Sequence, residues 1–285
     1  MSYQRAADCN VWILDVDDCL YHMDNIKNPG QPGLHQRVKD SITSNWNTHA
    51  SPALKAALAT HIQAAAAQFP EAAHIDPMNL QAQDLKIFYP YLLTAIKETD
   101  PANIRQWISV FYGDYYAECL APDPVLVEAL RTARQAGIRV LLYTNGPSNP
   151  TPGQDCHVQK VLRALGVDEI EIDALRPETQ DLIISENEGF AKPHPQSMEN
   201  FIKRFGINPA EALMADDSPP NLITAHKAGI LPIWTWTSDK APAAKDIEAM
   251  RGIALQVRDT AVMLLQIAHA RLIQLNPAPA LIPDA

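Results

Sequence analysis

Short apolar runs alternate with amphipathic helical patterns through the C-terminal two-thirds of the chain, and this alternation restricts the fold more than any other feature. It is typical of βαβ units, in which helices cover both faces of a buried parallel sheet. We therefore predict an α/β fold whose core is a Rossmann-like, doubly wound parallel sheet. The expected strands are Val11–Leu14, Ile138–Tyr143, Glu169–Ile172, Ala212–Ala215 and Pro232–Trp236.

Glycine residues mark the ends of two predicted helices between these strands. Val125–Ala136 stops at Gly137 and Pro220–Ala228 stops at Gly229. Glycine is the residue expected where a helix ends in a left-handed conformation. Apolar residues at helical spacing predict further helices at His157–Leu165, Ser197–Phe205 and Asp259–Gln274.

The segment from residue 21 to residue 120 contains hardly any strand pattern. Its helical patterns include Pro52–Phe69 and Asn103–Cys119. We expect residues 21–120 to form a helical domain that is inserted after the first strand. Residues 1–20 and 121–275 then form the α/β core, and the proline-rich residues 276–285 form a flexible tail.

Composition excludes several classes of partner. Apolar residues make up 47% of the chain, enough for a compact core. The net charge of −10 argues against a nucleic acid polymer, because a polyanion is repelled unless basic residues cluster. No apolar run approaches the roughly 18 residues of a membrane span, so we expect no membrane partner. The four cysteines lack CxxC spacing, which disfavours a zinc site or a disulfide framework and favours the cytoplasm. The sequence does not indicate the oligomeric state.

Acidic residues directly follow two of the predicted strands. Asp15, Asp17 and Asp18 come after the first strand, and Asp216 and Asp217 come after a later one. The carboxyl ends of parallel strands border the ligand crevice of such a sheet. Carboxylates this close raise each other's pKa unless a cation holds them, so the two clusters together indicate Mg²⁺ or a similarly hard ion. Taken alone, either cluster could instead cap the helix that follows it.

Two further segments suit a phosphate group. Thr144, Asn145 and Gly146 follow another strand and offer a hydroxyl, an amide and flexible backbone N–H groups. A hairpin turn is the alternative for Asn-Gly, but the helical pattern that comes next disfavours it. Lys192 lies in a loop before another helical pattern. Most loop lysines are merely solvated, so Lys192 gains significance only from the other motifs.

In this order, the four motifs resemble those of the haloacid dehalogenase superfamily of hydrolases. They are Asp15-x-Asp17, Thr144-Asn145, Lys192-Pro193 and Asp216-Asp217-Ser218-x-x-Asn221. The resemblance covers about residues 10–20 and 122–236. It implies that the helical insertion at residues 21–120 is a cap that closes over the active site and reads the leaving group of the substrate.

The resemblance also implies the chemistry of a phosphomonoesterase. Asp15 would attack phosphorus and form an aspartyl-phosphate. Asp17 would protonate the leaving oxygen and then activate water. Members that cleave carbon–halogen bonds typically lack the second aspartate, since a halide leaves without a proton. The presence of Asp17 therefore favours a phosphatase over a dehalogenase.

A phosphate monoester is an anion, so an anionic nucleophile needs positive charge around it. The resemblance implies Mg²⁺ as the cofactor, held by Asp15, the Asp17 carbonyl and Asp217, with Asp216 beside it. Lys192 would bridge the nucleophile and the phosphate. The remaining phosphate oxygens would be bound by Thr144, Asn145 and Gly146.

Two residues depart from the family pattern. Cys19 stands where threonine is usual, and Asp18 stands where asparagine or glycine is common. Cysteine is the weaker hydrogen-bond donor and Asp18 adds negative charge near the phosphate. These changes leave open a poorly active or repurposed site.

The core motifs look most like the pyrimidine 5′-nucleotidase branch of the superfamily. The residues that carry this likeness run from Asp15 to Tyr21, from Thr144 to Pro147, and include His157 and Asn221. We therefore expect a small-molecule phosphate ester as partner, such as a pyrimidine nucleoside 5′-monophosphate. The alternatives are a sugar-phosphate phosphatase or phosphomutase on the same scaffold, or a non-catalytic ligand-binding protein.

Aromatic residues of the insertion are candidates for contact with a substrate, although their helical spacing favours core packing. We expect His157 and His194 to be surface or loop histidines, and Trp234 and Trp236 to fill the core from a strand. The aromatic candidates are Tyr89, Tyr91, Phe111, Tyr112, Tyr115 and Tyr116.

Overall fold

The structure is a computed structural model that describes residues 3–21, 32–67, 70–145, 155–167, 192–236 and 242–276. The predicted strand Glu169–Ile172, Gly146 and the predicted tail beyond residue 276 lie outside these ranges. The chain divides into two compact units. The first comprises residues 1–23, 121–149 and 158–285, and the second comprises residues 24–120 and 150–157.

A parallel sheet forms the centre of the first unit. Its strands follow the order β2-β1-β3-β4-β5, and every neighbouring pair is parallel. The predicted α/β architecture is therefore confirmed. The bounds are Val11–Leu14 for β1, Arg139–Leu142 for β2, Ala212–Asp216 for β3, Leu231–Thr235 for β4 and Leu255–Val257 for β5.

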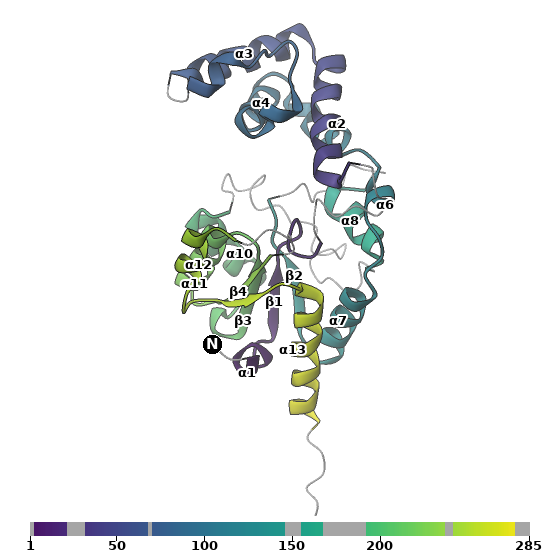
Figure 1. The fold of residues 1–285 in the computed structure, drawn as a ribbon, viewed down its shortest axis with the longest axis vertical. Helices are drawn as coiled ribbons and strands as arrows, with labels where there is room; N and C mark the ends of the chain where they lie inside the picture. Colours follow the sequence, from purple (N-terminus) through teal and green to yellow (C-terminus); the bar gives the residue numbers. More distant parts are fainter. Residues whose placement is uncertain are drawn as a thin grey trace, which may run out of the picture. The chain divides into compact units, whose positions relative to one another are not determined.

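Helices cover both faces of this sheet. Figure 1 shows α7 and α13 on one side and α10, α11 and α12 on the other. Helices α7 and α13 pack along one another and bury Leu126, Leu130 and Ile267. The bounds are Tyr3–Ala7 for α1, Pro124–Gln135 for α7, His157–Leu165 for α8, Pro195–Phe205 for α10, Pro209–Glu211 for the 3₁₀ helix η7, Pro219–Lys227 for α11, Ala244–Met250 for α12 and Thr260–Leu275 for α13.

The described part of the second unit is helical. Its core contains the fully buried Trp46, Phe88 and Phe111. The α-helices are α2 at Leu34–His49, α3 at Pro52–Ala66, α4 at Leu85–Thr99, α5 at Ile104–Tyr112 and α6 at Tyr116–Cys119. The 3₁₀ helices are η1 at Pro70–His74, η2 at Ala82–Asp84 and η3 at Pro101–Asn103.

The expected helical pattern at Asn103–Cys119 is divided between two helices, α5 and α6. Gly113 ends α5 with a φ of 57°, a conformation that glycine adopts without a steric penalty. A Cβ atom at this position would lie 2.5 Å from the Tyr115 ring. The chain therefore breaks into α5 and α6, because backbone conformation at one residue overrides the helical spacing around it.

The prediction that His157 is a surface or loop histidine was wrong. Its side chain is buried and its Nδ1 atom lies 2.7 Å from the Tyr116 hydroxyl. The rings of Tyr112 and Tyr116 pack against it. His194, by contrast, is exposed and caps α10 by accepting a hydrogen bond from the Gln196 N–H.

The other aromatic residues divide between core and half-buried positions. Trp234 is buried in β4, whereas Trp236 lies one residue beyond that strand and is half-buried. Phe111 and Tyr116 are buried, so core packing accounts for them. Half-buried side chains of the second unit include those of Tyr89, Tyr91, Tyr112 and Tyr115.

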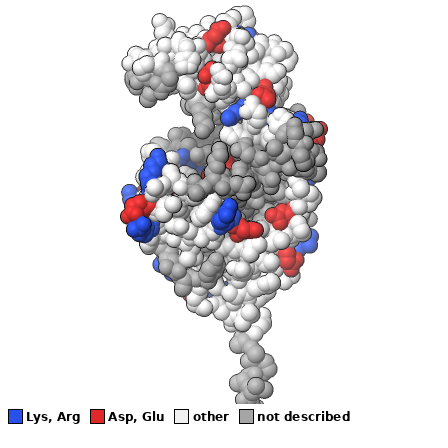
Figure 2. Space-filling view, viewed as in Figure 1, with Lys and Arg blue, Asp and Glu red and all other residues white. Residues whose placement is uncertain are grey.

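Figure 2 shows Lys and Arg side chains dispersed among Asp and Glu on the face in view, with no contiguous basic area among the described residues of that face. In the described ranges, no helix combines the length and the apolar character that a bilayer crossing needs.

Candidate active site

Three strands of the first unit bring the site residues together at their carboxyl ends. Leu14 of β1 pairs with Leu142 of β2 and Ala215 of β3. The next residue on each strand is therefore Asp15, Tyr143 or Asp216. Backbone hydrogen bonds extend the pairing, from Asp15 N to Ala215 O at 2.9 Å and from Tyr143 N to Leu14 O at 2.9 Å. Residues in register on parallel strands face the same side of a sheet, so these three side chains form a row.

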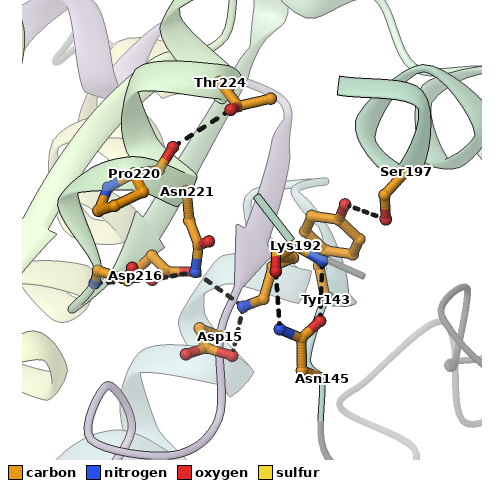
Figure 3. Close-up of polar contacts among 10 residues, drawn as sticks. Asp15, Tyr143, Asn145, Lys192, Ser197, Asp216, Pro220, Asn221 and Thr224 are labelled. Atoms are coloured by element: carbon orange, nitrogen blue, oxygen red, sulfur yellow. Dashed lines mark hydrogen bonds and ion pairs between the residues drawn. The ribbon is translucent and has the colours of Figure 1, made fainter. Parts of the chain in front are cut away.

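Lys192 connects two members of this row. Its Nζ atom donates to Asp15 Oδ1 at 2.7 Å and to Asp216 Oδ2 at 2.8 Å (Figure 3). Burial lowers the pKa of the Lys192 ammonium, but the attraction of the two carboxylates outweighs it and raises that pKa above its usual value. Burial and the neighbouring Asp216 raise the pKa of Asp15, and Lys192 opposes them. The structure thus brings the predicted nucleophile into contact with the predicted lysine.

Hydrogen bonds occupy both carboxylate oxygens of Asp216, which is fully buried. Its Oδ1 atom accepts from Ser218 N at 2.8 Å and from Asn221 Nδ2 at 2.9 Å. Its Oδ2 atom accepts from Lys192 and, at 3.1 Å, from Asn221 Nδ2. Asp216 is therefore a fixed anchor for the Lys192 ammonium.

Asp15, Asp216 and Asp217 form a carboxylate cluster, in which one oxygen atom from each lies within 4.8 Å of the others. Burial, followed by the charges of Asp216 and Asp18, raises the pKa of Asp217 to about 7. Lys192 supplies one positive charge to this cluster, so the negative charge is not fully compensated. Closely spaced carboxylate oxygens with excess negative charge fit a hard divalent cation such as Mg²⁺.

The Asp17 carboxylate does not belong to this cluster. It accepts a hydrogen bond from the Tyr21 hydroxyl, and Tyr21 is buried beside it. Tyr21 therefore fixes the orientation of the predicted acid and base. The predicted contribution of Asp17 to a metal site, through its backbone carbonyl, stays a prediction.

The predicted phosphate-binding residues have different environments. Thr144 is buried at the end of β2. The Asn145 side chain makes two hydrogen bonds to the backbone of Lys192. Its Oδ1 atom accepts from Lys192 N at 3.0 Å, and its Nδ2 atom donates to Lys192 O at 3.1 Å. From the other side, Thr224 Oγ1 donates to Pro193 O at 2.9 Å. Asn145 therefore positions the lysine segment, and its predicted backbone contact with phosphate stays a prediction.

Sequence reasoning missed several residues that hold this site in place. Asn221 belongs to the motif Asp216-Asp217-Ser218-x-x-Asn221, and Tyr143 directly precedes the predicted Thr144. The positions of these two residues in the sequence could therefore have indicated that they lie at the site. Ser197 and Thr224 are single polar residues on helices, and nothing in their spacing distinguishes them from solvated positions.

Both departures from the family pattern have a structural context. Asp18 has a φ of 56°, in the left-handed region that glycine and asparagine adopt more readily. Cys19 is fully buried, and burial raises the pKa of its thiol well above the usual value. Its complete burial makes Cys19 a packing residue of the loop after β1.

The comparison with protein families decides the identity. A family model described as haloacid dehalogenase-like hydrolase matches residues 10–229. The chain belongs to the haloacid dehalogenase-like hydrolases. The predicted superfamily is thus confirmed, and with it the expectation of a hydrolase.

This haloacid dehalogenase-like hydrolase is similar to curated proteins named phosphoglycolate phosphatase. One from Haemophilus influenzae (strain 86-028NP) is 28% identical over 134 residues, which are 47% of this chain and 53% of the relative. One from Pasteurella multocida (strain Pm70) is 31% identical over 122 residues, which are 41% of this chain and 48% of the relative. The chain spans about half the length of the curated relatives it matches.

Solved structures that resemble this hydrolase include CbbY from Rhodobacter sphaeroides in complex with phosphate, with a TM-score of 0.49 and 18% identity. That match covers 89% of this chain and 95% of the solved one. A β-phosphoglucomutase from Clostridium difficile has a TM-score of 0.47 and 11% identity, and the match covers 94% of this chain and 99% of the solved one.

Proposed function

We propose that this hydrolase cleaves a phosphate monoester through a covalent aspartyl-phosphate on Asp15. The contact of Lys192 Nζ with both Asp15 and Asp216 carries the proposal. It keeps the Asp15 carboxylate beside a permanent positive charge, which a nucleophile that attacks an anion needs. Hydrogen bonds from Asn145 and Thr224 hold the backbone of the segment that carries the lysine.

Two displacements at phosphorus complete the reaction. In the first, a carboxylate oxygen of Asp15 forms a bond to phosphorus, the ester P–O bond breaks, and Asp17 gives its proton to the leaving oxygen. In the second, Asp17 takes a proton from water, the water oxygen attacks phosphorus, and the bond to Asp15 breaks. Inorganic phosphate is released and both carboxylates return to their starting state. The hydrogen bond from Tyr21 orients Asp17 for both proton transfers.

Asp15 and Asp217, with the Asp17 carbonyl, would hold Mg²⁺. When bound, the cation supplies positive charge that offsets the repulsion between carboxylate and phosphate. Asp216 contributes by fixing Lys192, since its oxygens already accept hydrogen bonds from Lys192, Asn221 and Ser218 N–H.

The proposed substrate is a small phosphorylated metabolite. The curated relatives named above are phosphoglycolate phosphatases, and they do not support the expected pyrimidine 5′-nucleotidase branch. We therefore propose small phosphorylated acids as the preferred substrates, before pyrimidine nucleotides and sugar phosphates. The expectation that residues 21–120 act as a cap stays a prediction.

Phosphate release from a panel of esters tests this function. The panel contains phosphoglycolate, sugar phosphates and pyrimidine nucleoside 5′-monophosphates, each with Mg²⁺ and with EDTA. We expect release that depends on Mg²⁺ and that Asp15→Asn abolishes. Asp8→Asn is the matched control, because Asp8 is exposed and precedes β1, at the amino end of the sheet. Tight ester binding without release by the wild type would contradict the proposal and indicate a non-catalytic binding protein.

A further inference from the structure

Tyr143 is the third member of the row formed by Asp15, Tyr143 and Asp216, and Lys192 contacts all three. It lies one residue beyond β2, in register with Asp15, and its side chain is buried. The Lys192 Nζ atom lies 5.3 Å from the centre of the Tyr143 ring. An ammonium group within about 6 Å of an aromatic face is attracted to its electrons. Lys192 thus has three partners in the row, two carboxylates and one ring.

The Tyr143 ring is itself held in place. Its hydroxyl donates to Ser197 Oγ at 2.7 Å, and both groups are buried (Figure 3). Phe201, one turn further along α10, packs against the ring at 4.5 Å between centroids. The hydroxyl is therefore directed at α10, and the ring face is the part of Tyr143 that Lys192 contacts.

The three partners of Lys192 differ during the proposed reaction. When Asp15 forms the ester with phosphorus, the negative charge passes from its carboxylate to the phosphoryl group, so the contact between Lys192 and Asp15 changes during the reaction. The attraction of the Tyr143 ring is unchanged by that step. Resting on the proposed function, we infer that Tyr143, fixed by Ser197, is a positioning residue that keeps the Lys192 ammonium in place while Asp15 is esterified.

Three variants separate the ring from its hydroxyl. Tyr143→Leu removes the ring, Tyr143→Phe keeps it, and Ser197→Ala removes only the hydroxyl partner. Phe88→Leu is the matched control, because Phe88 is a fully buried aromatic residue of α4 that belongs to the other unit. It reports the general cost of exchanging a buried ring for leucine.

Steady-state kinetics supply the first measurement. From the strength of such contacts, Tyr143→Leu is expected to lower kcat by about 2- to 30-fold relative to Phe88→Leu, with little change in KM. Tyr143→Phe should recover most of this loss, and Ser197→Ala should lie between the two. A loss in Tyr143→Leu that matches the control, or one confined to KM, would overturn the inference.

Nuclear magnetic resonance supplies a measurement that needs no activity. An aromatic ring shifts protons above its face upfield, so the Lys192 ε-methylene signal, assigned with Lys192→Arg, should be upfield of ordinary lysines. The shift should persist in Tyr143→Phe and vanish in Tyr143→Leu. An ordinary position in the wild type would refute the contact even if a leucine variant failed to fold. If no ester is hydrolysed but the shift is present, the contact stands and the proposed function fails.

Discussion

At the scale of single residues, charge balance dominates the site. One ammonium group, that of Lys192, contacts two buried carboxylates, while Asp217 and Asp18 add further negative charge nearby. Groups that are proposed to bind a cation and a phosphate thus repel one another when neither is bound. We expect these residues to lower the stability of the metal-free protein in return for function.

Replacement of Asp217 should reveal this conflict. Asp217→Asn removes a carboxylate whose pKa is raised to about 7 by burial and by the charges of Asp216 and Asp18. We expect the free energy of unfolding of the metal-free variant to rise by about 1–2 kcal/mol. Urea denaturation in EDTA measures this difference, and a less stable variant would contradict the account of charge repulsion.

Asp18 combines an unfavourable charge with an unfavourable backbone conformation. Asp18→Asn removes only the charge, whereas Asp18→Gly also frees the backbone at a φ of 56°. Each change should stabilise the protein by about 0.5–1 kcal/mol, with glycine at least equal to asparagine. Thermal and urea unfolding of the pair distinguish the two causes. If both variants unfold more easily than the wild type, Asp18 makes a favourable contact that outweighs both effects.

At the scale of helices and strands, the ends of elements do most of the positioning. Asp15 and Asp216 lie at the carboxyl ends of β1 and β3, and Asn221 lies in the first turn of α11. Helix α7 begins after Asp123, whose Oδ1 atom accepts from Val125 N and Leu126 N, both at 3.0 Å. Packing of α7 on α13 then depends on a well-formed first turn of α7.

Removal of the Asp123 cap tests whether the packing of α7 on α13 depends on the first turn of α7. Asp123→Ala should lower the free energy of unfolding by about 1 kcal/mol, because two backbone N–H groups lose their acceptor. Asp259→Ala, which removes the matching cap of α13 at Val262 N, is the comparison and should cost a similar amount. An unchanged midpoint of chemical denaturation in both variants would show that water replaces the caps without loss.

Most of the strands followed from sequence because they are buried on both faces and read as unbroken apolar runs. Val11–Leu14 is an example, with every residue buried. The short β5 was missed, since only Val257 of its three residues is buried and it gives no such run. The break at Gly113 was missed for another reason, because helical spacing continues across it and only its backbone angle ends the helix.

The same contrast holds for the site. Asp15, Asp216 and Lys192 were predictable because charged residues at strand ends and in a matching motif order carry their own signal. The Tyr143–Ser197 hydrogen bond joins residues far apart in sequence. Such a contact depends on how α10 packs near the end of β2, and no local pattern encodes it.

At the scale of the whole molecule, binding of the cation should be linked to folding. A ligand that binds only the folded state stabilises it by about 2.7 kcal/mol at one hundred times its dissociation constant. We expect Mg²⁺ to raise the melting temperature of the wild type, and Asp217→Asn to lose most of this response while Asp8→Asn keeps it. Differential scanning fluorimetry over a Mg²⁺ titration measures it. An equal response in the two variants would remove Asp217 from the proposed metal site.

The sheet order also has a consequence for how the protein is made. β1 lies between β2 and β3, yet β2 begins only at Arg139. At typical translation speeds, a ribosome needs roughly ten seconds to add the residues between these strands. Throughout that interval the nascent Val11–Leu14 segment is apolar and lacks both neighbours. Pairing of Val11–Leu14 in the sheet is therefore completed only after the whole segment between β1 and β2, and later β3, has been synthesised.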